Sequence, residues 1–370
     1  MIIRFLTPDD VPEHDKITSQ AFSYSCEIGN PDSALPCEKV LGAFDDDGRT
    51  LLADFELNER KCYYDGGILT CAAVGGVAAK PEHRGKGAVT ALFARLMENP
   101  VYDISILYPF SEGYYRRFGY ERTGLCLSAC VPFPEISAVP RTNDVTLYEG
   151  KDTEKLLSIY NRCAGGLNLC FVRDSARAYS DKPYYSQKYT YIYKDGAYAT
   201  IQIDRETGSL IVSEIFFDSL GSMLGILGFF RNFEANLNKI IFSKLPLNTP
   251  LTGIIREMKD CDIKMHNNGS AAILNTEKVL GMHKYPVSEG GFTLQAGEDI
   301  FGVTVSGEKA EVIKDASLLP DVITDKCTAA GILLNGTSIA RNNPALKINN
   351  PESDFFKMFP QKVSFFCDEF

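Results

Sequence analysis

The residues with the clearest chemical potential stand in one stretch, "VAAKPEHRGKGAVTALFARLM", where a basic turn separates an apolar run from a helical pattern. Gly85 and Gly87 remove two side chains where the helix is expected to begin, so a ligand could approach the backbone closely. The first N–H groups of a helix have no partner within it, and the helix dipole adds positive potential at that end. With Arg84 and Lys86 adding charge, the stretch indicates a site for an anionic group such as a phosphate.

Two common phosphate-binding patterns are excluded in this stretch, because it holds neither the P-loop pattern G-x-x-x-x-G-K-S/T nor the dinucleotide fingerprint G-x-G-x-x-G. The expected strand before the turn ends in Val77, Ala78 and Ala79, where no large side chain would block a ligand lying alongside. This combination suits a long ligand that carries a pyrophosphate, such as coenzyme A. A solvated basic turn without a ligand is the alternative.

A second stretch with chemical potential is "SEGYYRRFG". Ser111 is a typical helix N-cap and Gly119 a typical C-cap, so the stretch predicts a short helix between them. On that helix, Tyr115 is a phenol that stays protonated at neutral pH and can donate a proton to a leaving group. The alternative is that Tyr115 only packs, as its neighbours Tyr114 and Phe118 are expected to do.

Composition and charge exclude several classes of protein. The 370-residue chain has a formal net charge of -10, which argues against a nucleic-acid binder and favours cationic small partners. Its Cys 11 and His 4 form no C-x-x-C, H-x-x-H or H-E-x-x-H pattern, so we expect no metal site, and the scattered thiols indicate a reducing, cytoplasmic setting. The apolar runs are too short for a signal peptide or a membrane helix, so no membrane partner is expected.

Alternating strand and helix patterns predict a mixed α/β (α+β) fold in three segments, residues 1–137, 145–261 and 262–370. The first segment has a hairpin pattern at "VLGAFDDDGRTLLADFEL", a buried strand at "ILTCAAVGGVAA", a helix at "GAVTALFARLMENP" and a strand at "DISILYPF". The second repeats this order in "KYTYIYKDGAYATIQI", "GSLIVSEIFF" and "SMLGILGFFRNFEANL", without a counterpart of the basic glycine turn. The proline-rich "VPFPEISAVPRTND" is typical of a linker between them.

The third segment predicts helices at "AAILNTEKVL" and "DVITDKCTAAGILL". Its expected strands are "GFTLQAG", "IFGVTVSG", "KAEVIK" and the terminal "KVSFFCDEF". The simplest role for the last strand is to complete the sheet of this segment.

Two motifs of the sequence resemble those of a known family. "VAAKPEHRGKGA" is similar to the acyl-CoA-binding motif of GNAT N-acetyltransferases, V-x-V-x-P-x-x-R-x-x-G-x-G/A, with Val89 in place of the last Gly or Ala. "FSEGYYRRFGYERTG" resembles the S-E-G-x-Y-x-R-F-G-Y block of the enhanced-intracellular-survival (Eis) acetyltransferases and is one residue shorter than the family form. The resemblance implies tandem GNAT folds with mixed central sheets, the second lacking the CoA motif, then a sterol-carrier-protein-like domain over residues 262–370. It also implies a homo-oligomer, commonly a hexamer.

The resemblance also assigns roles to single residues. Tyr115 would be the proton donor to the departing thiolate, and the α-carboxylate of Phe370, after Glu369, would reach the active site. The contacts to acetyl-CoA would come from the strand end, the helix start and the tyrosine block: Val77, Ala78, Ala79, Arg84, Gly85, Lys86, Gly87, Ala88, Val89, Thr90, Ser111 and Glu112.

The function that these observations favour is acetyl-CoA-dependent N-acetyl transfer, without a metal, by direct attack of a primary amine. The resemblance implies an acceptor that is aminoglycoside-like, polyamine-like or a lysine side chain. We expect "SYSCEIGNPDSALPCEK" to border the acceptor pocket. The alternative is an apolar-ligand-binding protein that uses the sterol-carrier-like domain beside a vestigial GNAT part. Val89 and the shortened tyrosine block favour this alternative, whereas the intact P-x-x-R-x-x-G turn and the Glu-Phe terminus favour the enzyme.

Overall fold

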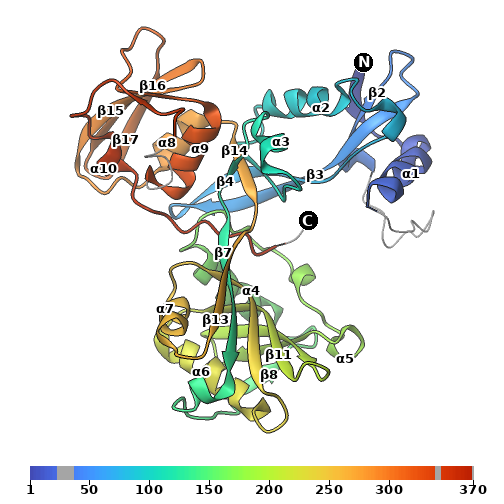
Figure 1. Cartoon of the computed structure of the whole chain (residues 1–370), viewed down its shortest axis with the longest axis vertical. Coiled ribbons are helices and arrows are strands. Elements are labelled where there is room, and N and C mark those ends of the chain that lie inside the picture. The colour runs from blue at the N-terminus through green and yellow to red at the C-terminus, as the bar shows by residue number, and fades with distance from the viewer. Residues whose placement is uncertain (23–36, 338–342, 369–370) are drawn as a thin grey trace.

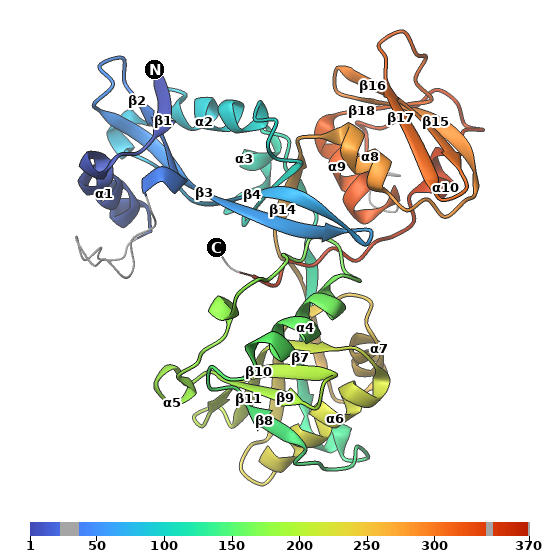
Figure 2. The same ribbon diagram turned by 180° about the vertical axis from the view of Figure 1, so that it is seen from behind.

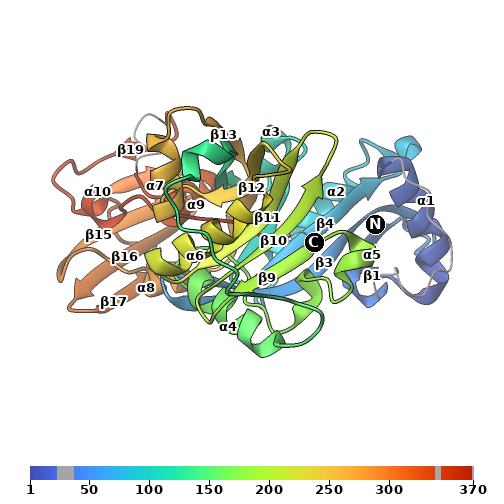
Figure 3. The same ribbon diagram turned by 90° about the horizontal axis from the view of Figure 1, so that it is seen from below.

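The structure is a computed structural model that describes residues 1–22, 37–337 and 343–368. The described chain forms three lobes, each built on one sheet (Figure 1). The first lobe carries the N-terminus, the second lies below it in the view of Figure 1, and the third holds the last sheet of the chain. Seen from behind and from below, the long hairpin of β3 and β4 extends from the first lobe toward the third (Figures 2 and 3).

The first sheet is seven-stranded, in the order β1-β2-β3-β4-β5-β14-β6. Its strands are β1 (Ile2–Phe5), β2 (Val40–Phe44), β3 (Leu51–Tyr64), β4 (Gly67–Ala79), β5 (Ile104–Leu107), β6 (Glu121–Arg122) and β14 (Ser270–Ile273). The helices of this lobe are α1 (Val11–Phe22), α2 (Ala88–Met97) and α3 (Glu112–Arg116). Because side chains alternate along β3, Phe55 packs on Phe93 of α2 while Asp54 faces α1 through His14.

The second sheet is also seven-stranded, in the order β13-β7-β12-β11-β10-β9-β8. Its strands are β7 (Leu125–Pro132), β8 (Val145–Leu147), β9 (Tyr189–Tyr193), β10 (Ala197–Asp204), β11 (Ser209–Phe217), β12 (Lys239–Pro246) and β13 (Asp262–Asn267). Its helices are α4 (Thr153–Ala164), α5 (Pro183–Ser186), α6 (Leu220–Phe230) and α7 (Pro250–Glu257).

The two large sheets repeat one arrangement, as the sequence predicted. In the first, the antiparallel hairpin of β3 and β4 leads through α2 to β5, which runs parallel to β4. In the second, the antiparallel hairpin of β10 and β11 leads through α6 to β12, which runs parallel to β11. The expected mixed α/β fold with tandem sheets and flanking helices is therefore confirmed.

Strands cross between these sheets. β7 lies in the expected first segment, yet it pairs with β12 and β13 in the second sheet. β13 and β14 open the expected third segment, yet β14 returns to the first sheet between β5 and β6. The chain therefore passes from the first lobe to the second along β7 and back along β13 and β14.

The third sheet is five-stranded, in the order β17-β16-β15-β18-β19. Its strands are β15 (Glu289–Ala296), β16 (Asp299–Ser306), β17 (Lys309–Lys314), β18 (Val322–Thr324) and β19 (Lys347–Ile348), and its helices are α8 (Thr276–Met282), α9 (Lys326–Asn335) and α10 (Phe355–Met358). The helix expected over "AAILNTEKVL" was half wrong, because its first residues form β14 and the helix begins only after the N-cap Asn275. In "DVITDKCTAAGILL", likewise, β18 precedes the N-cap Asp325.

The proline-rich stretch expected to be a linker is part of the second core instead. It begins inside β7 and continues as a short 3-10 helix, Phe133–Ile136. Phe133 and Ile136 are buried in the apolar cluster that α6 and β12 also fill. The prolines stiffen this packed corner, so a composition typical of linkers was misleading here.

The terminal strand was also predicted wrongly. Its described part, residues 362–368, is called the C-terminal strap below, and it does not join the third sheet. The strap leaves the third lobe and passes toward the space between the first and second lobes (Figures 1 and 2). Its only bridge within the described residues is a parallel one between Asn168 and Ser364, and the N–H of Phe365 donates to Asn168 O (2.8 Å).

The strap is held at its start by charge and in its middle by packing. Lys362 Nζ contacts Asp65 Oδ2 at the tip of the β3–β4 hairpin (2.5 Å), and burial lowers the pKa of Lys362 to about 8. Phe366 is buried against Gly124 and Gly269, where an added Cβ would come within 2.7 and 2.1 Å of its ring. Two glycines thus leave the space that this ring fills.

We predict that Gly124→Ala lowers the free energy of unfolding by about 1–3 kcal/mol, because the new methyl group overpacks the seat of Phe366. The matched control is Gly253→Ala, an exposed position in α7 where an added Cβ meets nothing within 4 Å. The control should be neutral or stabilising by up to about 1 kcal/mol. Thermal unfolding of both variants checks this, and equal behaviour of the two would contradict the packing account.

Candidate active site

The site begins where β4 and β5 part. The two strands pair in parallel from Cys71 opposite Ile104 to Val74 opposite Leu107, and β4 then continues to Ala79 paired with β3 but no longer with β5. The register of β4 against β3 shifts in the same place, and Gly76 adopts a left-handed φ of 56°. The end of β4 is therefore detached from β5, and its polar backbone groups on that side are open to another partner.

The turn after β4 has the backbone that its glycines require. A short 3-10 helix, Pro81–His83, is followed by Gly85 and Gly87 with φ values of 83° and 81°. An added Cβ at either glycine would meet nothing within 4 Å, so the space in front of the turn is open. The glycines serve backbone conformation and ligand access rather than close packing.

The N-terminus of α2 lacks a side-chain cap. Gly87 is the N-cap residue and makes no side-chain hydrogen bond, and the first helical bond runs from Ala91 N to Gly87 O (2.9 Å). The N–H groups of Ala88, Val89 and Thr90 precede that bond and point out of the helix start. These three N–H groups lie where the sequence predicts that an anion binds.

The equivalent helix of the second lobe is different. Ser219 caps α6 by accepting a hydrogen bond from Ser222 N (3.1 Å), and Ser222 Oγ in turn donates to Asp218 Oδ1 (2.8 Å). One N–H of its first turn is therefore capped by a side chain, and a carboxylate stands beside that cap. Of these two related helices, only α2 presents an open, uncapped start.

The basic residues of the turn divide into two kinds. Lys80 is held by Glu13 (Nζ to Oε2, 2.6 Å) and is only partly exposed. Arg84 and Lys86 are exposed, and within the described residues neither makes an ion pair. Their charges are available to a phosphate at the turn.

Ser111 and Glu112 lie at the start of α3 and are occupied by protein contacts. Ser111 caps the helix through Tyr114 N (3.4 Å). Glu112 pairs with Arg122 (Oε2 to Nη2, 2.5 Å) and accepts from Asn267 Nδ2 (2.6 Å). The Arg122 guanidinium holds the pKa of Glu112 below its usual value. In this structure Glu112 joins α3 to β6 and β13.

Tyr115 is buried in the apolar cluster that also contains the end of β4 and the start of α2. Its ring meets Phe93 of α2 edge-on at 5.8 Å and Phe110 at 5.4 Å. Val77 and Val89 pack against the same cluster. Burial raises the pKa of Tyr115, so the phenol is protonated at neutral pH. Within the described residues its hydroxyl makes no hydrogen bond.

The last predicted site residue, Phe370, lies outside the described residues, as does most of the segment expected to border the acceptor pocket (residues 23–36). The nearest described residue to the chain end is Asp368, whose backbone oxygen accepts from the hydroxyl of Tyr108. Tyr108 directly follows β5. The strap therefore ends, as far as it is described, beside the point where β4 and β5 part.

A buried acid and imidazole pair was missed by sequence reasoning. Asp54 is 0% exposed in β3 and pairs with His14 of α1 (Oδ2 to Nδ1, 2.9 Å), while its other oxygen has no partner among the described atoms. Burial raises the pKa of Asp54. The pKa of His14 is also raised: burial, the largest single effect, lowers it, but the hydrogen bond to Asp54 and the nearby carboxylate charges together raise it by more. The signal was present as an Asp inside the apolar run "LLADF".

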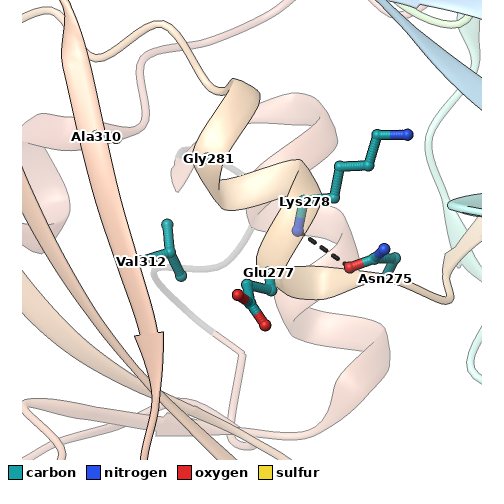
Figure 4. A pocket seen from close by; sticks show the side chains of 6 residues that line it. All are labelled: Asn275, Glu277, Lys278, Gly281, Ala310 and Val312. Atoms are coloured by element: carbon teal, nitrogen blue, oxygen red, sulfur yellow. Dashed lines mark hydrogen bonds between the residues drawn. The ribbon is translucent and has the colours of Figure 1, made fainter.

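The third lobe has a groove of about 420 Å³ between α8 and β17 (Figure 4). In the close view, the polar side chains of Asn275, Glu277 and Lys278 stand on one side of it and Val312 on the other. In the same lobe, α9 is buried on all sides from Cys327 to Asn335, because it packs between the core of this lobe and strands β6 and β14 of the first sheet. The groove is polar and superficial, which does not suit an apolar ligand.

Two features are absent from the described part of the chain. None of its helices is long and apolar enough to cross a membrane. None of its His, Cys, Asp and Glu side chains gather in threes in a way that could hold a metal ion.

A known protein family matches the first lobe. Residues 2–123 match the family model of the acetyltransferase (GNAT) domain. A search of curated proteins gave no significant match. The chain therefore carries a GNAT acetyltransferase domain, and its class of enzyme is N-acetyltransferase.

Solved structures match the whole chain. A conserved protein of unknown function from Enterococcus faecalis V583, described as a probable N-acyltransferase, aligns with a TM-score of 0.82 at 17% identity over 100% of this chain and 99% of that one. A GCN5-related N-acetyltransferase from Anabaena variabilis gives 0.80 at 17%, and Eis1 from Mycobacterium abscessus gives 0.81 at 16%, each over 100% of both chains. At these identities the likeness establishes a shared fold of all three lobes.

The His14–Asp54 pair generates a pH prediction. A histidine whose folded pKa is raised stabilises the fold below its unfolded pKa of about 6.5, and this stabilisation is lost as the pH rises through the folded pKa. The raised pKa of Asp54 acts in the same direction. In Asp54→Asn, His14 loses both the hydrogen bond and the charge of Asp54. Burial then lowers its pKa against the smaller effects of the Asp15 and Glu56 charges, so the slope weakens or reverses.

The difference in melting temperature between wild type and Asp54→Asn should therefore fall as the pH rises from about 5 to 8.5. Other titrating groups, such as the buried His283, cancel in this difference. Thermal unfolding across that range measures it, and a difference independent of pH would rule out the assigned pair.

Proposed function

We propose that the chain transfers the acetyl group of acetyl-CoA to a primary amine at the point where β4 and β5 part. The observation that carries this proposal is the uncapped start of α2 beside two open glycines, in contrast to the capped start of α6. The pyrophosphate would bind the N–H groups of the first turn of α2, with Arg84 and Lys86 adding charge. The acetyl-pantetheine arm would lie along residues 77–79, whose outer edge β5 has left.

The proposed reaction is direct attack. The amine nitrogen forms a bond to the acetyl carbon, the carbon–sulfur bond breaks, and the sulfur leaves as a thiolate. Backbone N–H groups by residues 77–79 would stabilise the oxyanion. Tyr115 would donate its proton to the thiolate, and a base would take one proton from the amine, so the products are an amide and free CoA.

The proposed base is the α-carboxylate of Phe370. Asp368 contacts Tyr108 at the end of β5, and two further residues span at most about 7 Å, so the parting of the strands lies within reach. An ordinary α-carboxyl pKa of about 3.3–3.7 makes this group a weak base at neutral pH. Orientation and attraction of a cationic acceptor are the contributions it can make most readily.

Some finer parts of the proposal rest on sequence patterns: the division into domains 1–137, 145–261 and 262–370, and a cytoplasmic setting. Others rest on the resemblance: a sterol-carrier-like third domain and a hexameric assembly. The acceptor is proposed as aminoglycoside-like, polyamine-like or a lysine side chain. The formal net charge of -10 supports a cationic acceptor through the long-range field.

The alternative function, apolar-ligand binding by the third lobe, has less support. The groove beside α8 in that lobe is polar, which does not suit an apolar ligand. Val89, which departs from the GNAT pattern, contributes its backbone N–H to the helix start and packs its side chain on the cluster of Tyr115. The side chain of Val89 is therefore compatible with an enzymatic function.

We predict that Gly87→Glu abolishes acetyl-CoA binding, because a carboxylate would stand where the pyrophosphate lies. The matched control is Gly307→Glu in the turn between β16 and β17, which has a similar φ of 64° and also no atom within 4 Å of an added Cβ. Both variants carry the same backbone strain and the same new charge. Calorimetric titration with acetyl-CoA should show loss only in Gly87→Glu, and equal binding by the two would refute the site.

Tyr115→Phe keeps the ring and removes the proton. We expect turnover to fall by a factor on the order of 10²–10⁴ while acetyl-CoA affinity changes little. The control is Tyr114→Phe, one residue away on the same short helix. Steady-state release of free thiol measures both. A Tyr115→Phe rate within about twofold of wild type would favour a packing role for the ring.

Appending a few residues after Phe370 tests the proposed base. The carboxylate is displaced while the strap, residues 362–368, is retained. Acetyl transfer should fall sharply, with the melting temperature and acetyl-CoA binding nearly unchanged. Normal turnover of the extended protein would mean that the terminal carboxylate has no role, and that the base is a pocket side chain or water.

A further inference from the structure

An arginine of the second lobe forms an ion pair with the described end of the strap. Arg173 is 8% exposed and lies between α4 and α5. Its Nε donates to Asp368 Oδ1 (2.9 Å), and its Nη2 lies 2.8 Å from the same oxygen. The strap is therefore joined to the second lobe by a charged, two-donor contact.

The guanidinium of Arg173 is also held by other side chains of the second lobe. Glu214 of β11 pairs with both Nη atoms of Arg173, at 2.9 and 2.6 Å. The guanidinium carbon lies 3.8 Å from the ring centre of Tyr160, whose hydroxyl donates to Asp368 Oδ2 (3.3 Å). A planar guanidinium held by one carboxylate and stacked on a ring has a single orientation toward the other carboxylate.

The other side of Asp368 faces the first lobe, where its backbone oxygen accepts from Tyr108 after β5. Asp368 is thus fixed between two lobes, by its side chain on one and by its backbone on the other. Phe366, two residues earlier, is seated between glycines. The position and orientation of Asp368 are set by these contacts.

We propose that Arg173 is a positioning residue for acetyl transfer, which holds Asp368, and with it the described end of the strap, beside the parting of β4 and β5. This inference rests on the proposed function, because it assigns those residues a part in the reaction. Arg173 touches no reacting atom in this account. It acts on the first lobe's chemistry from the second lobe, which supplies a reason for the second lobe to be present without a CoA turn of its own.

Removing Arg173 leaves the partly buried carboxylate of Glu214 without a cation and held by the hydroxyl of Tyr198, so that variant is expected to fold poorly. The main test therefore uses Asp368→Asn, which keeps the shape of the side chain and leaves the Arg173–Glu214 pair intact. The matched control is Arg162→Gln, which removes an ion pair to Asp218 on the surface of the same lobe. Asp368→Glu, which restores the charge, serves as the conservative variant.

The first readout does not depend on activity. Carboxypeptidase should release Phe370 at least about tenfold faster from Asp368→Asn than from wild type or Arg162→Gln, at nearly equal melting temperatures. Release at the wild-type rate would overturn the anchoring role.

The second readout is kinetic. In Asp368→Asn we expect kcat to fall on the order of 10-fold to 100-fold, because small misplacements of a reacting group have effects of this size. The KM for acetyl-CoA should stay within about twofold, and Asp368→Glu should recover part of kcat. Faster release of Phe370 with an unchanged kcat would overturn the positioning role while leaving the proposed function in place. Absence of acetyl transfer by the wild-type protein, by contrast, would overturn the proposed function.

Discussion

The loss of pairing between β4 and β5 beyond Val74 is the feature on which the rest of this account depends. A parallel sheet normally satisfies every central strand on both edges, so an open edge inside a sheet leaves backbone donors and acceptors that need partners. The bulge at Gly76 and the glycine turn after Ala79 carry the chain from that edge into α2. An anionic ligand at the start of α2 with an extended arm along β4 would satisfy both sets of groups.

The remainder of the molecule places other groups against this opening. β14 inserts between β5 and β6 and so fixes the far side of the sheet, while β7 and β13 connect it to the second lobe. The strap uses these connections. It is bound to the hairpin tip through Lys362, seated between glycines through Phe366, and anchored by Arg173 through Asp368. All three lobes therefore contribute to the position of the strap beside the parting of β4 and β5.

Much of the fold was readable from the sequence where it depends on neighbours in the chain. The hairpin around the Asp-Gly turn, the helix after Gly87 and the Ser111 cap follow from local backbone preferences, and all three are present. Strand exchange was not predictable, because alternation in β7 and β14 fixes which side chains are buried but not which sheet supplies the partners. The proline-rich corner and the strap were predicted wrongly for a related reason, since the burial of their apolar side chains depends on contacts far away in sequence.

The residues of the candidate site also differ in how far they could be predicted from their neighbours in the chain. The glycine turn and Tyr115 carry their signal in adjacent residues, whereas His14 and Asp54 are 40 positions apart and Arg173 and Asp368 are 195 apart. A single Asp in an apolar strand was the one local trace of the first pair, and the second pair left none. Pairs of this kind are recognised only when the fold has brought them together.

Hydrogen–deuterium exchange with and without acetyl-CoA tests the central claim most directly, because the claim concerns particular backbone N–H groups. We expect the ligand to slow exchange in the peptide that covers residues 77–91, from the free end of β4 through the first turn of α2. The peptide that covers residues 217–224, at the capped start of α6, should be unchanged. Equal protection of both helix starts, or protection of neither at saturating acetyl-CoA, would contradict the account.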